Sequence, residues 1–208
     1  MKRLTIQFFI IFSFVAHIYA QSDTIQKTQK IINEVVAKSY PELKSKNIEV
    51  QIFKSESDYF QSRFSFGKML TLQKMRYIIF VNPKVFEKNA PESGIRSIIA
   101  HELAHVLYYS QRNRVELIGL ARLSSKDFNQ KFERGADLEA IARGYGEGLK
   151  DYRNWLYQNI PAKNLEEKKR NYFSPEEIDL MLEILQKKPE TIEKWRKNVP
   201  RNKAEITP

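Results

Sequence analysis

Residues 98–107 have the sequence Ile-Ile-Ala-His-Glu-Leu-Ala-His-Val-Leu, an apolar run that carries two histidines and one glutamate. In an α-helix, residues four apart share a face, so His101 and His105 can both reach one metal ion. Glu102 stands beside His101, where a carboxylate can take a proton from a water molecule. This spacing is the HExxH pattern, and it indicates zinc-dependent hydrolysis of peptide bonds.

The helix that carries this pattern is expected to span roughly residues 89–110 and to be buried. Asn89 supplies a cap and Pro91 an early proline at its start. A helix that is apolar nearly all round is a buried one, and its apolar positions are Ile95, Ile98, Ile99, Leu103 and Val106. An unpaired carboxylate is costly to bury. The alternative interpretation, in which two histidines pack in the core and the glutamate lies on the surface without a function, is therefore a poor explanation of Glu102.

The segment before this helix predicts one helix and two strands. Residues 24–40 carry apolar side chains at helical spacing up to Pro41, and residues 48–53 alternate apolar and polar side chains as a strand does. Residues 77–81, Tyr-Ile-Ile-Phe-Val, give the clearest strand of the chain. Residues 55–66 are ambiguous, and a short helix followed by a loop through Gly67 is one interpretation of them.

The segment after the HExxH helix predicts helices only. Residues 128–149 are helical, with glycines that end or kink the helix near Tyr145. Residues 152–157 continue as a helix, and Ser174-Pro175 opens another with a cap and a proline in its first turn. Two strands followed mostly by helices predict an α+β fold, in which a small sheet accompanies a buried metal-binding helix.

The length of 208 residues is enough for one compact domain with a sizeable core. We expect this domain to comprise residues 21–199. Residues 200–208 are polar and are expected to form a disordered tail.

Residues 1–20 resemble a secretory signal peptide. Lys2 and Arg3 precede the apolar residues 8–15, and Ala20 is a small residue at a plausible cleavage point. The alternative, an uncleaved membrane anchor, needs about 20 continuous apolar residues, and this run is shorter. Export to the periplasm or the extracellular space is therefore expected. Of the three histidines, only His17 would be lost, which leaves the two in HExxH.

The chain has no cysteine, which excludes disulfides, a lipid-modified amino-terminal cysteine and a cysteine-ligated zinc site. Its net charge is +10, with basic clusters at residues 168–170 and 194–197. A nucleic-acid binder uses such patches, but an exported chain rarely meets nucleic acid, and none is expected as a partner. A solvated helical face, or weak association with an anionic envelope surface, explains the charge better.

The third ligand of a catalytic zinc ion must then be an aspartate or a glutamate, because three protein ligands are usual and no further histidine is present. Glu133 and Asp137 lie one helical turn apart in a later helix. Glu133 can reach the metal, and Asp137 can accept a hydrogen bond from the free ring nitrogen of a ligand histidine. A solvated pair of acids is the alternative for these two residues.

These two motifs together, HELAH and the later Glu133-Arg-Gly-Ala-Asp137, resemble the gluzincin metallopeptidases, especially the membrane-associated and periplasmic kind with a Glu-x-x-Ala-Asp motif. The resemblance covers roughly residues 95–145. It implies a zincin-like fold, one Zn²⁺ per chain held by His101, His105 and Glu133, Glu102 as the general base, and Asp137 supporting a ligand.

The chain departs from this family in two respects. It has no run of transmembrane helices, and no histidine follows Glu133 to stabilise the oxyanion of the reaction. The nearest candidates for that role are Tyr145 and Arg143, although a tyrosine after a helix more often packs in the core.

The expected activity is hydrolysis of a peptide or protein substrate, with Glu102 taking a proton from water and delivering it to the leaving amine. The strand 77–81 precedes the metal-binding helix, where zincins present a sheet edge. We expect Ile79, Phe80 and Val81 to pair with an extended substrate by strand addition.

Two other functions stay open. The first is a metal-dependent binding module on a zincin frame that does not turn over substrate. The second is a basic envelope-binding protein in which the histidines are incidental. The helix at residues 24–40 either packs on the sheet or serves as an inhibitory pro-segment.

Overall fold

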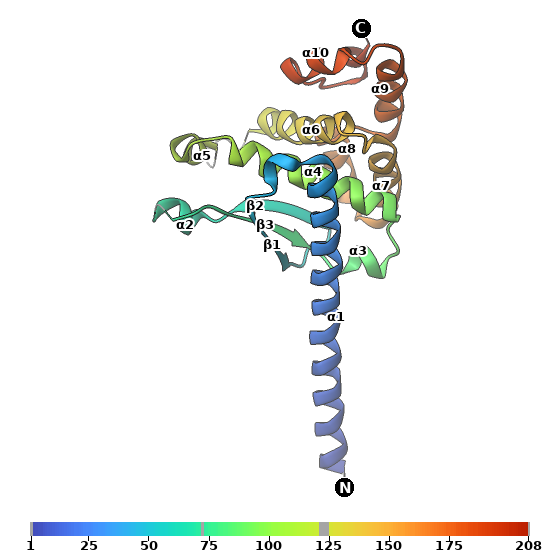
Figure 1. Cartoon of the computed structure of the whole chain (residues 1–208). Helices are drawn as coiled ribbons and strands as arrows, with labels where there is room; N and C mark the ends of the chain where they lie inside the picture. The colour runs from blue at the N-terminus through green and yellow to red at the C-terminus, as the bar shows by residue number, and fades with distance from the viewer. Residues whose placement is uncertain (1, 72, 121–124, 208) are drawn as a thin grey trace.

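Figure 1 shows the computed structural model of the chain, which describes residues 2–71, 73–120 and 125–207, with the backbone alone for residues 2–20 and 120. The helices are α1 (Lys2–Ser39), α2 (Phe66–Leu70), α3 (Lys84–Glu87), α4 (Glu92–Ser110), α5 (Arg114–Leu120), α6 (Lys126–Ala142), α7 (Gly146–Asn159), α8 (Ala162–Asn171), α9 (Pro175–Lys187), α10 (Thr191–Lys197) and α11 (Lys203–Ile206), with a 3-10 turn at Pro41–Leu43. The strands are β1 (Asn47–Ile52), β2 (Phe60–Phe64) and β3 (Arg76–Val81). The predicted α+β class is confirmed.

The predicted signal peptide falls on the first half of α1, where side chains are not described, so it stays a prediction. In the part of the chain whose side chains are described, no helix is long and apolar enough to cross a membrane. The second half of α1 packs on α4 and β1, with Ile32 and Val35 buried in the core.

The sheet is small and mixed, with the strand order β1-β3-β2. β1 runs parallel to β3, and β2 runs antiparallel to it. β3 is therefore the central strand, and the prediction that Ile79, Phe80 and Val81 form a substrate-binding edge is wrong. The backbone hydrogen bonds of these residues go to β1 and β2. Strong apolar β-propensity marks a buried central strand more often than an edge.

The strand β2 was not recognised in the sequence, because Phe60-Gln-Ser-Arg-Phe64 carries three polar residues among five. Its side chains nevertheless alternate, with Phe60 and Ser62 buried and Arg63 exposed. β2 packs against α4 and forms the edge of the sheet on that side.

The helix α4 lies between the sheet and α6, and it crosses α7 at close range (Figure 1). Glycines permit this crossing. A Cβ atom at Gly94 of α4 would lie 3.1 Å from the Cβ of Tyr152, and one at Gly148 of α7 would overlap the Ser97 hydroxyl and the Ser93 carbonyl. The close approach brings the buried side chain of Arg153 on α7 beneath the HExxH segment.

The helix predicted over residues 128–149 is interrupted near Tyr145, as its glycines predicted. α6 ends at Ala142, Gly144 adopts a left-handed backbone with a φ of 89°, and α7 begins at Gly146. A residue without a Cβ is favoured in this conformation just after a helix.

A second apolar cluster lies beyond α6 and is built around Phe173, Ile178, Met181, Trp195 and Ile206. The predicted disordered tail belongs to it. Asn202 caps α11 by accepting a hydrogen bond from the Glu205 backbone, and the side chain of Ile206 is fully buried. The prediction for residues 200–208 is therefore wrong over residues 202–206. Ile206 packs into the cluster, and Arg201 and Asn202 add hydrogen bonds with Glu205.

Candidate metal centre

Three potential ligand atoms converge where α4 faces α6. The Nε2 atoms of His101 and His105 lie 3.2 Å apart, and each lies 3.2 Å from Oε2 of Glu133. His101 and His105 are one turn apart on α4, and Glu133 projects from α6. We call these three residues the metal triad. They form a group that could hold a metal ion, as the sequence predicted.

The spacing of the metal triad fits a zinc ion. Tetrahedral zinc with ligands at about 2.0–2.1 Å separates them by about 3.3 Å, close to the 3.2 Å found here on all three sides. The ring of His101 is oriented for this role, because its Nδ1 lies 2.7 Å from Oδ1 of Asp137. A histidine that donates its Nδ1 hydrogen presents the lone pair of Nε2 to the ligand site.

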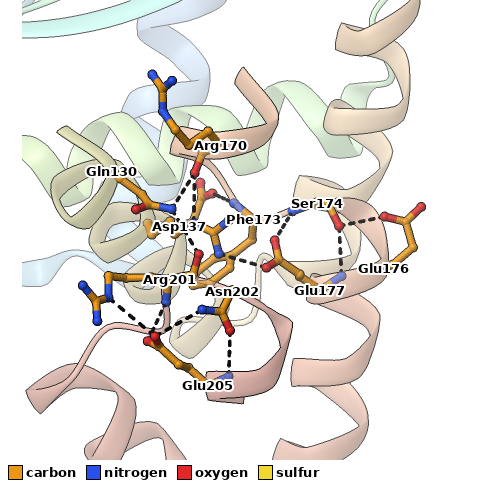
Figure 2. Close-up of polar contacts among 11 residues, drawn as sticks. Gln130, Asp137, Arg170, Phe173, Ser174, Glu176, Glu177, Arg201, Asn202 and Glu205 are labelled. Atoms are coloured by element: carbon orange, nitrogen blue, oxygen red, sulfur yellow. Dashed lines mark hydrogen bonds and ion pairs between the residues drawn. The ribbon is translucent and has the colours of Figure 1, made fainter. Parts of the chain in front are cut away.

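Asp137 is itself held from three directions. It accepts hydrogen bonds from His101, from the Arg153 guanidinium at 2.8 Å and from the backbone of Phe173 at 3.0 Å. Figure 2 shows the last of these contacts, at the start of the capping box that Ser174 and Glu177 form for α9. Burial alone would raise the pKa of Asp137, but Arg153 and His101 hold that pKa below its usual value. The carboxylate is therefore ionised and fixed.

The charges around the metal triad favour a divalent cation. The pKa values of Glu133 and Asp137 lie below their usual values, so two negative charges are buried beside the guanidinium of Arg153. Without a metal, and against the effect of burial, Asp137 and Glu133 raise the pKa of His101 to about 10, which shows that this arrangement attracts positive charge. Buried charges are stable only when they are paired. A dication between the three ligand atoms would supply the balance.

Glu102 lies on the side of α4 that faces β2. Burial raises the pKa of its carboxyl group, an effect that the two histidines oppose. The buried hydroxyl of Ser62 on β2 lies close enough to the Glu102 carboxyl group to lower its pKa. The site therefore places an acid–base group and a polar hydroxyl side by side, next to the metal triad.

A small hollow of about 20 Å³ adjoins His101 and Glu102. Phe60 of β2, Lys168 of α8 and Tyr172, which follows α8, are among the residues that line it. The ammonium of Lys168 lies 2.5 Å from Oδ1 of Asp58, and both residues line the hollow. The hollow is therefore small.

Tyr172 is the aromatic residue that stands over the ligand histidine in this hollow. Its ring centre lies 5.8 Å from that of His101, and the Arg153 guanidinium lies 4.3 Å from the ring. Burial, and then the charge of Glu133, raise the pKa of its hydroxyl well above the usual value. The hydroxyl is therefore a neutral hydrogen-bond donor at the site.

The other side of the metal triad is apolar. The ring of Phe132 stacks on His105, with centres 4.3 Å apart, and Tyr109 lies beyond it at 6.3 Å from His105. The Glu133 side chain, at 25% exposure, is the most accessible of the triad, against 1% and 6% for the histidines. Solvent therefore reaches the site from the glutamate side.

The two residues predicted as oxyanion stabilisers are engaged elsewhere. The Tyr145 hydroxyl lies 3.0 Å from the Ser39 hydroxyl. The Arg143 guanidinium donates to the Ser39 carbonyl, to Glu42 and to Glu139 and lies over the Tyr40 ring. Both residues hold the end of α1, and no described contact joins either one to the metal triad. The structure therefore does not bring these two side chains into contact with the metal triad as we expected, because their spacing in the sequence does not show where a side chain points in the fold.

The late basic clusters lie mostly on the surface, as a solvated face requires, since Lys169, Arg170, Lys194 and Lys197 are exposed. Two of their other cations are paired: Lys168 with Asp58, and Arg196 with Glu139 and Glu193. Asp58 and Glu139 come from distant segments, so the sequence did not reveal these two pairings.

Arg153, Tyr172 and Ser62 were not identified from the sequence. Arg153 lies in a helical segment with polar neighbours, and Tyr172 stands in the connection between α8 and α9. A weak signal existed for Arg153 alone, because the acidic cluster needs a cation and Arg153 follows Asp137 in the next helix.

Comparison of the chain with protein-family models, with curated proteins and with solved structures finds no match.

Proposed function

We propose that the chain is an exported zinc-dependent peptidase of zincin type. The observation that carries the proposal is the metal triad, three ligand atoms at 3.2 Å from one another with Glu102 beside them. His101, His105 and Glu133 would hold the ion, and Asp137 would fix the ring of His101. When bound, zinc would lower the pKa of a water molecule toward about 7 and polarise the scissile carbonyl.

The carboxylate of Glu102 takes the proton from the attacking water and passes it to the leaving amine. Its buried position supports this role, since burial raises the pKa of a carboxyl group and makes the carboxylate a better base. The Tyr172 hydroxyl is proposed to donate a hydrogen bond to the oxygen on which negative charge develops. It replaces Tyr145 and Arg143 in this role.

An extended substrate is proposed to pair with β2 rather than with β3. β2 is the edge strand beside α4, and Phe60 lines the hollow at Glu102. An extended peptide can add to such an edge through backbone hydrogen bonds. Peptide binding would require side chains that line the hollow to move, because a volume of about 20 Å³ does not hold a peptide.

The small volume of this hollow also supports a second candidate function, a metal-dependent binding module without turnover. Such a module would keep the metal triad and need no room at Glu102. The Glu102→Gln variant distinguishes the two functions, because it removes the base and leaves all three ligand side chains in place.

The experiment that tests the proposal is a measurement of zinc content and peptide hydrolysis on the wild type, Glu133→Ala and Glu102→Gln. A peptidase would hold one zinc per chain, lose it in Glu133→Ala, and keep it without turnover in Glu102→Gln. Zinc without hydrolysis of any peptide in a mixed-sequence library would support the binding module. A wild type that takes up no zinc would rule out both.

A further inference from the structure

The helices α2 and α5 project together from one side of the molecule, at the left of Figure 1. The Arg114 guanidinium ties them, with hydrogen bonds to the carbonyls of Met69 at 2.7 Å and Gln73 at 2.9 Å. Met69 and Leu117 are buried at 2% and 1% exposure. We call Phe66–Leu70 and Arg114–Leu120 together the α2–α5 lobe.

The α2–α5 lobe exposes several large apolar side chains. Among the residues whose side chains are described, the exposed large hydrophobic ones are Phe66, Leu70, Val115 and Ile118, at 51%, 58%, 78% and 36%. Phe66 and Leu70 are four apart on α2, and Val115 and Ile118 are three apart on α5. Each pair therefore shares one helix face. A gathering of exposed apolar side chains on one projection indicates an interaction surface.

A basic hollow of about 800 Å³ adjoins the lobe. Lys46, Lys74, Arg112 and Arg114 line it, no acidic residue does, and Val115 joins it to the apolar surface. The two arginines donate to backbone carbonyls of Tyr108, Met69 and Gln73, which are neutral acceptors. Among the described ion pairs none involves these four cations. The sequence around β2 and α2 reinforces the charge, with no acidic residue between Asp58 and Glu87.

We propose that the α2–α5 lobe docks on an anionic phospholipid bilayer. The four exposed apolar side chains would enter the membrane interface, and the cations of the hollow would face the lipid phosphates. Apolar residues flanked by uncompensated lysine and arginine fit this partner. A protein partner would need roughly 1,000 Å² of complementary surface, whereas the lobe offers the tips of two short helices. The proposal does not depend on the peptidase function.

The absence of cysteine makes the test site-specific. The full-length variants Val115→Cys and Glu183→Cys each take one environment-sensitive fluorophore. Glu183 is exposed on α9, on the side of the molecule away from the lobe (Figure 1). With vesicles of phosphatidylcholine and phosphatidylglycerol, the label at position 115 is expected to shift to the blue and to become protected from iodide. The label at position 183 is expected to do neither, and phosphatidylcholine vesicles alone are expected to leave both unchanged.

Charge removal in the hollow supplies the second measurement. Each lysine near an anionic surface contributes about a 5-fold gain in affinity, so Lys46→Gln with Lys74→Gln should weaken vesicle binding by about 25-fold. Circular dichroism checks that the double variant is folded. The proposal is overturned if the label at position 115 ignores anionic vesicles, if the double variant binds them unchanged, or if soluble polyglutamate gives the same blue shift. The last result would point to an acidic protein partner.

Discussion

The guanidinium of Arg153 lies 2.8 Å from the same Asp137 oxygen that accepts the Nδ1 hydrogen of His101. Both partners of this ion pair are buried, at 1% and 0% side-chain exposure. Arg153 therefore fixes the charge of Asp137, and the same carboxylate orients the ring of His101 in the metal triad. The pair links the stability of the helix packing to the geometry of the metal triad.

Replacing Arg153 by methionine should therefore destabilise the fold severely. The change leaves the Asp137 carboxylate buried without its charge partner, which costs about 3–5 kcal/mol of unfolding free energy. Urea unfolding measures this loss. The matched control is Lys150→Met, which removes exposed ion pairs with Asp179 and Glu147 and should cost less than about 1 kcal/mol. Equal losses in the two variants would mean that the Arg153–Asp137 pair has no special role.

Replacing Tyr172 by phenylalanine tests the proposed oxyanion donor. Loss of one such donor lowers kcat by about 10²- to 10³-fold, and the zinc content should not change because the metal triad is intact. The control is Tyr157→Phe, since the Tyr157 hydroxyl on α7 is buried without a hydrogen-bond partner in the described structure. A Tyr172→Phe variant with wild-type turnover would remove Tyr172 from the mechanism.

The Lys168–Asp58 ion pair predicts an acid-sensitive contribution to stability. Burial would raise the pKa of Asp58, but Lys168 and the hydroxyls of Ser57 and Ser55 bring it below its ordinary value. A carboxyl whose pKa is lower in the folded state stabilises the fold above its unfolded-state pKa of about 3.9. That contribution is lost as the pH falls through the lowered folded-state pKa.

The pair is partly exposed, so its contribution should stay below about 1 kcal/mol. Thermal unfolding of the wild type and Asp58→Asn between neutral pH and pH 2 measures it. The two curves should converge in acid, where Asp58 is protonated in both folded and unfolded chains. A gap that persists at the lowest pH would assign the stabilisation to something other than this charge.

The metal triad could be predicted from the sequence because its geometry is local or nearly so. HExxH places His101, Glu102 and His105 within a single helical turn, and the shortage of other ligands left Glu133 as a candidate. Asp137 follows Glu133 by one turn of the same helix, so its place behind a histidine was also foreseeable. The structure brings these residues together as expected.

The predictions that the structure did not support depended on contacts between distant segments of the chain. The neighbours of β3 are set by chain connections that no strand pattern reveals, so β3 was taken for an edge. Arg143 and Tyr145 point to the end of α1, whose position the sequence did not fix. Ile206 was overlooked because its partners in the second apolar cluster come from α6 and α9. Residues that share one helix could be assigned to the site from the sequence, whereas the direction in which a side chain points in the folded protein could not.

The close crossing of α4 and α7 predicts that Gly148 tolerates no side chain. A Cβ atom there would overlap the Ser93 carbonyl, a backbone atom that cannot move aside cheaply. Gly148→Ala should therefore lower the unfolding free energy by about 1–3 kcal/mol, the usual cost of overpacking. Gly67→Ala on α2 is the matched control, because nothing lies within 4 Å of its Cβ position. In a helix this change should be neutral or stabilising by up to about 1 kcal/mol.

The same substitution also tests how the helix crossing supports the metal triad. Arg153 lies on α7, five residues after Gly148, so a forced separation of α4 from α7 would pull its guanidinium away from Asp137. Zinc affinity should fall in Gly148→Ala and stay unchanged in Gly67→Ala, as competition with a chelator would show. If Gly148→Ala loses stability but keeps full zinc affinity, α7 supports the fold without positioning the ligands.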